Sequence, residues 1–182
     1  MEREGLSGLS PSLDAAGIQD CVLFGHSDGA SIALVNAGCV RDARVRGVIV
    51  MAPHVFTEAV GLRSIEGARD AYLHGDLRAK LAKYHGANVD CAFHGWCDSW
   101  LHPDFAQWNI EHVLPGIRVP LLQVQGEDDQ YGTPAQLAAI ERGVSGRCST
   151  ALLPDCCHTP QFEQPGATLE VVVEFLRGLS GT

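Results

Sequence analysis

Four short apolar runs, separated by turn residues and helical patterns, restrict the fold of this chain more than any other feature. The runs span residues 21–24, 45–52, 120–125 and 149–153 and are rich in Val, Ile and Leu. Their apolar residues follow one another without alternation, which is typical of strands buried on both faces of a parallel sheet. Parallel neighbours are joined by right-handed crossovers, usually helical. We therefore predict an α/β fold with a parallel sheet of about four strands flanked by helices.

Helical patterns lie between and after these runs. The clearest spans residues 167–179, and its apolar residues at helical spacing predict one face packed on the sheet. These residues are Leu169, Val172, Val173, Leu176 and Leu179. Thr133 followed by Pro134 is typical of a helix start, with Thr133 as the N-cap. Shorter helices are expected over residues 9–16 and 30–37.

The interval from about residue 57 to 117 interrupts the alternation of strands and helices. It contains no convincing strand and holds all three tryptophans, Trp96, Trp100 and Trp108. Long and apolar residues between 65 and 84 fit one or two helices interrupted near Gly75. We predict a helical insertion into a single α/β domain, because 182 residues are hardly enough for two domains.

Composition and charge exclude several classes of protein. Thirteen Lys and Arg residues against 22 Asp and Glu give a net charge of −9, with no basic cluster. Nucleic acids and anionic membrane surfaces are therefore not expected as partners. No apolar run approaches the ~20 residues that span a bilayer. The start Met1-Glu2-Arg3-Glu4 has no signal-peptide layout, so we expect a cytoplasmic protein.

The cysteines and histidines suggest neither disulfides nor metal. The seven cysteines are odd in number and form no C-x-x-C pair, which favours reduced thiols. The eight histidines show no pair at i, i+4 spacing with a carboxylate between them. We expect no metal site.

Gly25-His26-Ser27-Asp28-Gly29 is a G-x-S-x-G motif that follows the first apolar run and precedes a helical pattern. A serine on such a strand-to-helix turn projects its hydroxyl away from the sheet, where it can act as a nucleophile. The two glycines are expected to relieve crowding in the turn. The helix start directs main-chain amides toward developing negative charge, and the N–H of Asp28 is the candidate oxyanion donor.

An acid and a histidine follow in the order that a serine nucleophile requires. The run 120–125 leads into Gly126-Glu127-Asp128-Asp129, and the run 149–153 leads into Pro154-Asp155-Cys156-Cys157-His158. Functional groups in open α/β sheets lie beyond the carboxyl ends of strands. Taken singly, the acids could form a solvated turn and His158 could be a surface residue. Cys156 and Cys157 could suggest a cysteine nucleophile, but neither follows a strand-to-helix turn.

Together, the three segments Gly25–Gly29, Gly126–Asp129 and Pro154–His158 resemble the α/β-hydrolase superfamily over nearly the whole chain. The G-x-x-D pattern of that family maps onto Asp129 rather than Asp128, and its late histidine maps onto His158. The Ser-Asp-Gly elbow and the segment Gly67-Ala68-Arg69-Asp70 are similar to biphenyl-hydrolase-like and meta-cleavage-product hydrolases. The resemblance implies catalytic residues Ser27, Asp129 and His158, no cofactor, and a cap formed by residues 57–117.

The resemblance also implies that the chain is the C-terminal part of the fold. Only 26 residues precede Ser27, whereas hydrolases of this fold place several strands and the second oxyanion donor before the elbow. We therefore expect weak activity from the chain alone. We also expect an exposed sheet edge through which two copies could associate.

Other residues are candidates for contact with a small-molecule substrate. His26 lies in the motif, His54 follows the second apolar run, and Trp96 and Trp100 lie in the insertion. The Asp28 carboxylate could attract a substrate ammonium group or simply stabilise the helix start. The expected reaction is cleavage of an ester, a thioester or an activated carbon–carbon bond of a small acyl or aromatic substrate. The alternative is an inactive remnant or a binding protein of the same fold.

Overall fold

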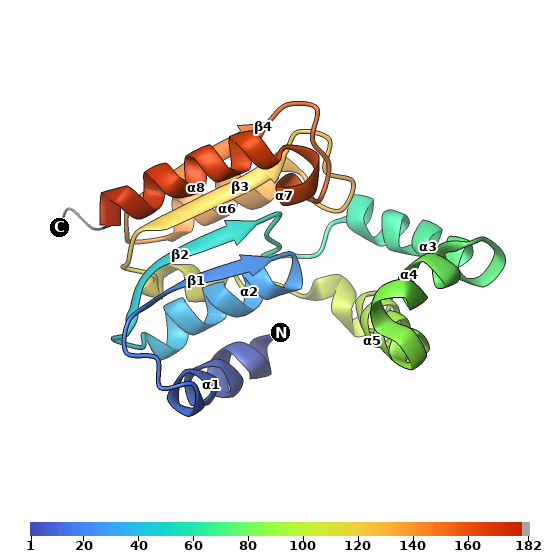
Figure 1. Ribbon diagram of the computed structural model, residues 1–182, viewed down its shortest axis with the longest axis horizontal. Helices are drawn as coiled ribbons and strands as arrows, with labels where there is room; N and C mark the ends of the chain where they lie inside the picture. Colours follow the sequence, from blue (N-terminus) through green and yellow to red (C-terminus); the bar gives the residue numbers. More distant parts are fainter. Residues whose placement is uncertain (180–182) are drawn as a thin grey trace. The chain divides into compact units, whose positions relative to one another are not determined.

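A parallel sheet with strand order β1-β2-β3-β4 organises the fold (Figure 1). The computed structural model describes residues 1–179. The strands are β1 (Cys21–His26), β2 (Val45–Met51), β3 (Leu121–Gly126) and β4 (Cys148–Leu153). Each pairs in parallel with the next, so their carboxyl ends share one edge of the sheet. The predicted α/β class and four-stranded parallel sheet are confirmed.

Burial explains why the central strands are mostly apolar. Every residue of β3 is buried, and so is every residue of β2 except Arg46. Within residues 1–179, β1 has a strand neighbour on one side only. Phe24 in that strand is 53% exposed. The described sheet therefore has an apolar outer strand.

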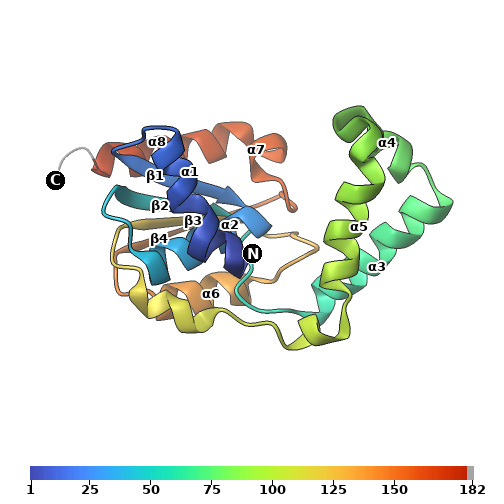
Figure 2. The same cartoon turned by 90° about the horizontal axis from the view of Figure 1, so that it is seen from below.

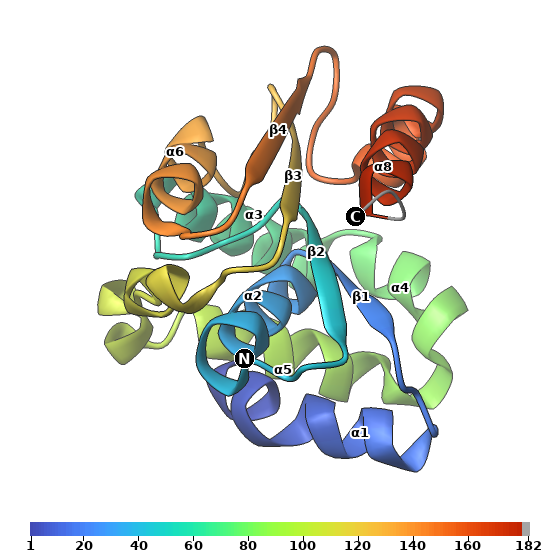
Figure 3. The same cartoon turned by 90° about the vertical axis from the view of Figure 1, so that its left-hand side faces the viewer.

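Helices cover both faces of the sheet (Figure 3). Helix α8 (Pro165–Leu179) packs on β2 and β3 from one side. Helix α2 (Asp28–Val35) packs on β1 and β2, and α6 (Pro134–Gly143) on β3 and β4, from the other side. Thr133 caps α6 as predicted, because its side chain accepts a hydrogen bond from the Ala135 amide. The other described helices outside residues 57–108 are η1 (Glu4–Gly8), α1 (Leu9–Ala15), η2 (Asn36–Val40), η5 (Glu111–Gly116) and α7 (Pro160–Glu163).

The buried face of α8 matches the predicted one in part, since Val172 lies in the core and Leu179 packs against it. Thr168, Val172 and Phe175 are the buried residues, whereas Leu169 is 63% exposed and Leu176 is 38% exposed. The predicted helix is confirmed, but its apolar stripe is rotated toward Phe175. An aromatic ring buries more apolar area than a leucine side chain, so this orientation favours Phe175 at the sheet.

The chain divides into two compact units. The first comprises Met1–Phe56 and Asn109–Thr182, and the second comprises Thr57–Trp108. The predicted insertion therefore ends earlier than residue 117, because η5 buries Val113 and Leu114 within the first unit.

All regular secondary structure within residues 57–108 is helical. It contains α3 (Ala59–His74), α4 (Leu77–His85) and α5 (Val89–Trp100), with short helices η3 (Gly86–Asn88) and η4 (Pro103–Gln107) (Figure 2). Helix α3 ends before Gly75, as predicted. Tyr72 of α3 stacks on Phe93 of α5 with ring centroids 3.7 Å apart. In residues 1–179, no helix combines the length and the apolar character that a membrane crossing requires.

Candidate active site

Ser27 lies at the sharp turn between β1 and α2. Its backbone has φ 54° and ψ −123°, a conformation that side-chain-bearing residues rarely adopt. Such a conformation costs of order 1–3 kcal/mol and persists only where surrounding contacts enforce it. The Ser27 amide donates to the Met51 carbonyl of β2 at 2.9 Å, and the Ser27 carbonyl accepts from the Ala30 amide of α2. The turn is therefore held by both elements.

Gly25 allows the turn to close. A Cβ atom at this position would lie 2.3 Å from the carbonyl oxygen of Gly29, so only glycine fits. A Cβ atom at Gly29 would meet nothing within 4 Å among the described residues. The predicted crowding is therefore found at the first glycine of the motif and not at the second.

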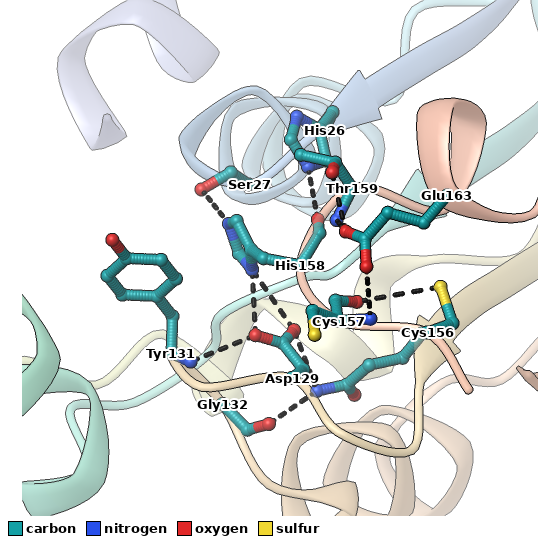
Figure 4. A network of polar contacts seen from close by, with 11 residues as sticks. His26, Ser27, Asp129, Tyr131, Gly132, Cys156, Cys157, His158, Thr159 and Glu163 are labelled. Atoms are coloured by element: carbon teal, nitrogen blue, oxygen red, sulfur yellow. Dashed lines mark hydrogen bonds and ion pairs between the residues drawn. The ribbon is translucent and has the colours of Figure 1, made fainter. Parts of the chain in front are cut away.

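Ser27, His158 and Asp129 form a continuous hydrogen-bonded line (Figure 4). The distance from His158 Nε2 to Ser27 Oγ is 3.0 Å. His158 Nδ1 lies 2.9 Å from Asp129 Oδ1 and 3.1 Å from Oδ2. A carboxylate only accepts hydrogen bonds, so Nδ1 carries the proton and Nε2 is left to accept from the serine hydroxyl. This arrangement can transfer a proton from Ser27 to His158.

The Asp129 carboxylate is buried but remains ionised. Burial alone raises the pKa of a carboxyl, but the hydrogen bond and charge of His158, together with the Tyr131 amide, bring the pKa of Asp129 below its usual value. The Tyr131 amide donates to Oδ1 at 2.9 Å, and Gln125 Nε2 donates to Oδ2 at 3.2 Å. Asp128, by contrast, is exposed.

Gln125 is a site residue that the sequence analysis missed. It is fully buried at the end of β3, and its amide also donates to the Gly132 carbonyl at 2.6 Å. The available signal was the presence of two amide side chains, Gln123 and Gln125, in a strand that is buried throughout. Such a residue needs buried hydrogen-bond partners, and here one of them is Asp129.

The segments that carry the acid and the histidine are joined through their main chains. The Asp128 amide donates to the Cys156 carbonyl at 2.9 Å. A Cβ atom on Gly126 would lie 2.0 Å from that same carbonyl oxygen. Glycine is therefore required here for the two segments to approach each other.

Three rings surround the imidazole of His158. The centroid of His26 lies 5.1 Å away, and that of Tyr131 lies 4.8 Å away. The centroid of His54 is 5.7 Å away, with the two planes inclined by 27°. His54 is 5% exposed, and its carbonyl accepts from Ser31 Oγ at 2.6 Å. His26 and His54 thus lie beside His158, and Tyr131 joins them without having been predicted.

The other predicted site residues have different surroundings. Asp28 occupies the first turn of α2, directly after Ser27. Trp96 and Trp100 lie on α5 in the second unit, where Trp100 is 6% exposed and packs against Phe105 and Trp108. Trp96 meets Phe93 edge to face. Cys156 is buried, which raises its pKa to about 11 and keeps the thiol protonated.

No family model and no curated protein sequence matches this chain. Solved structures match it in fold. A membrane phospholipase A described as a bacterial virulence factor is 19% identical with a TM-score of 0.73, and the match covers 96% of this chain and 62% of that one. A meta-cleavage product hydrolase from Pseudomonas fluorescens IP01 is 19% identical with a TM-score of 0.76, covering 97% and 72%.

A thermophilic esterase from Thermogutta terrifontis is 20% identical with a TM-score of 0.62, and the match covers 98% of this chain and 72% of that one. The protein has the α/β-hydrolase fold. This α/β-hydrolase-fold chain spans about 62% of the length of the phospholipase and somewhat more of the other two proteins. In this fold the nucleophile, acid and histidine follow one another in the order found for Ser27, Asp129 and His158.

Among the described residues, no group of three or more His, Cys, Asp or Glu side chains is arranged to hold a metal ion.

Proposed function

We propose that this protein is a serine hydrolase that cleaves an ester, a thioester or an activated carbon–carbon bond of a small acyl or aromatic substrate. The observation that carries the proposal is the line from Ser27 Oγ through His158 to Asp129, with contacts of 3.0 Å and 2.9 Å. The strained backbone conformation of Ser27 also supports the proposal, since strained residues cluster at functional sites.

The proposed mechanism assigns one role to each group. His158 Nε2 takes the proton of the Ser27 hydroxyl as Oγ attacks the substrate carbonyl. His158 then gives that proton to the leaving group, and an acyl-enzyme remains on Ser27. A water molecule, activated by His158 in the same way, releases the acid and restores the serine.

Asp129 and Asp28 act without forming covalent bonds. The Asp129 carboxylate accepts the hydrogen bond from Nδ1–H of His158 and stabilises the imidazolium that forms during each step. The Asp28 amide, at the start of α2, donates to the developing oxyanion. The family resemblance implies that the insertion predicted over residues 57–117 acts as a cap. The named neighbours are a phospholipase, a meta-cleavage product hydrolase and an esterase, so they leave the substrate of this chain open.

The first experiment is labelling with a fluorophosphonate, followed by mass spectrometry of the labelled peptide. We expect a covalent adduct on Ser27, and we expect Ser27→Ala to abolish it. His158→Ala should slow labelling and ester hydrolysis by several orders of magnitude, because nucleophile and base act as a unit. Wild-type protein that stays unlabelled would favour the alternative of an inactive binding protein.

The substrate class can then be narrowed with a panel of esters and thioesters. Varying the acyl chain from acetyl to long-chain, and including aromatic acyl groups, separates esterase from thioesterase and aryl-acyl preferences through kcat/KM. A vinylogous 1,5-diketone tests the carbon–carbon bond reaction.

A further inference from the structure

The segment that carries His158 has few main-chain hydrogen bonds, one of them from the Asp128 amide to the Cys156 carbonyl. It runs from Pro154 to Thr159 between β4 and α7 and has no helix or strand of its own. Asp155 within it adopts a positive φ of 50°. A segment without a ladder of main-chain hydrogen bonds needs other contacts to fix it.

His26 supplies one of these contacts. Its Nε2 lies 2.8 Å from the main-chain carbonyl oxygen of His158, although the two residues are 132 positions apart (Figure 4). A carbonyl only accepts, so His26 donates its Nε2 proton. His26 directly precedes Ser27, and the contact therefore links the turn that holds the nucleophile to the main chain of the histidine.

Burial and the contact with the His158 carbonyl also fix the protonation state and the tautomer of His26. Burial lowers its pKa, so the ring is neutral at pH 7. With the proton on Nε2, this nitrogen is committed to the carbonyl of His158. A direct hydrogen bond from Nε2 of His26 to a substrate would break that contact.

Glu163 supplies contacts on both sides of His158. Its Oε2 accepts from the Cys157 amide at 2.7 Å. Its Oε1 accepts from the Thr159 amide at 2.8 Å and from the Thr159 hydroxyl at 2.6 Å. One carboxylate thus holds the residues before and after His158, while His26 holds the carbonyl of His158 itself.

We propose that His26 is a positioning residue, which holds the main chain of His158 at the distance that proton transfer from Ser27 requires, and that the Glu163 carboxylate completes this support. The inference rests on the proposed function. The ring of His158 must keep its contacts with Ser27 and Asp129 while its charge changes, and a fixed main chain limits the displacement of the ring during the reaction.

The test compares His26→Phe with His26→Gln. Phenylalanine keeps a planar ring without a donor, whereas the glutamine amide carries an N–H at a similar reach. With an ester that wild type hydrolyses, we expect His26→Phe to lower kcat by about 10–100-fold, since small displacements of reacting groups cost up to ~10² in rate. KM should stay within about twofold, and His26→Gln should recover most of kcat. His112→Phe, at an exposed position, is the matched control and should match wild type.

Two results would overturn the role of His26. Equal loss in His26→Phe and His26→Gln would show that the donor is not what matters. A rise in KM with unchanged kcat would make His26 a substrate contact instead. Circular dichroism verifies that each variant is folded, and if His26→Phe does not fold, the comparison of His26→Gln with His26→Ala decides.

Glu163→Gln provides a second variant with a readout independent of turnover. Its amide NH₂ cannot accept, so at least one of the two main-chain amides loses its partner. In a Ser27→Ala background we expect hydrogen exchange at the Cys157 or Thr159 amide to speed up by about tenfold. In the active protein kcat should fall with little change in KM. Glu170→Gln, on an exposed part of α8, is the control.

The outcomes separate the inference from the proposed function. Wild type that fluorophosphonate does not label overturns the proposed function and this inference with it. Labelled wild type with undiminished kcat in both His26→Phe and Glu163→Gln overturns the inference alone. Faster exchange in Glu163→Gln with unchanged kcat would make the Glu163 contacts purely structural and contradict the proposal for that residue.

Discussion

Asp128 and Asp129 are adjacent acids with different surroundings. The Asp129 side chain is 1% exposed and contacts His158, whereas Asp128 is exposed. We expect Asp129→Asn to lower kcat by up to ~10⁴, because the amide can favour the wrong imidazole tautomer. Asp128→Asn should change kcat by less than about threefold. Steady-state ester hydrolysis by both variants measures this, and the opposite ranking would move the acid role to Asp128.

Glu163 should affect stability in acid. Hydrogen bonds from the Thr159 hydroxyl and the Cys157 amide lower its pKa from 4.5 to about 2. Since the folded-state pKa lies below the unfolded-state value, the ionised carboxylate stabilises the fold above about pH 4.5, and this contribution is lost as the pH falls toward 2.

Thermal melts of wild type and Glu163→Gln across this range measure the effect. We expect wild type to have the higher Tm at pH 6 and the difference to disappear near pH 2. Because the Glu163 side chain is exposed, screening by water limits the difference to roughly 1–2 °C. A difference that stays constant across the range would contradict the assignment.

The segments that follow β3 and β4 can approach each other only because residue 126 is glycine. An added Cβ atom would collide with the Cys156 carbonyl oxygen at 2.0 Å. We expect Gly126→Ala to lower the free energy of unfolding by about 1–3 kcal/mol, as overpacking does. It should also reduce kcat, because Asp129 and His158 follow on the two segments.

Gly166→Ala is the matched control, since a Cβ atom there meets nothing within 4 Å among the described residues. Urea unfolding and ester turnover of both variants provide the comparison. Gly126→Ala with wild-type stability would show that the two segments separate without cost.

Local patterns predicted the elements better than the contacts between them. The strands follow from apolar runs, and the strand-to-helix turn follows from a five-residue motif, so both could be predicted. The α8 face was predicted only in part: Val172 and Leu179 pack in the core, but helical spacing alone cannot tell that Phe175 rather than Leu176 meets the sheet. The contact of His26 was missed because its partner lies 132 positions away in the sequence. The contacts of Gln125 reach only four and seven residues along the chain, but they depend on the path of the loop after β3, which apolar patterns do not predict.

Association of two copies through β1 stays a prediction. Within residues 1–179, β1 has a sheet neighbour on one side, and Phe24 on it is 53% exposed. Unpaired main-chain groups on an apolar outer strand favour pairing with another chain. We expect concentration-dependent association in analytical ultracentrifugation and expect Phe24→Lys to weaken it. A wild-type monomer at all concentrations would contradict this.

The backbone of Ser27 implies a compromise between folding and chemistry. A residue at position 27 must adopt φ 54°, which costs free energy when it carries a side chain and little when it is glycine. The free energy of unfolding of Ser27→Gly should therefore exceed that of Ser27→Ala by about 1 kcal/mol, although both variants lack the nucleophile. Equal stability of the two variants in urea would show that the turn carries no such strain. If the difference is found, natural selection has kept a residue that weakens the native state because only its hydroxyl can react.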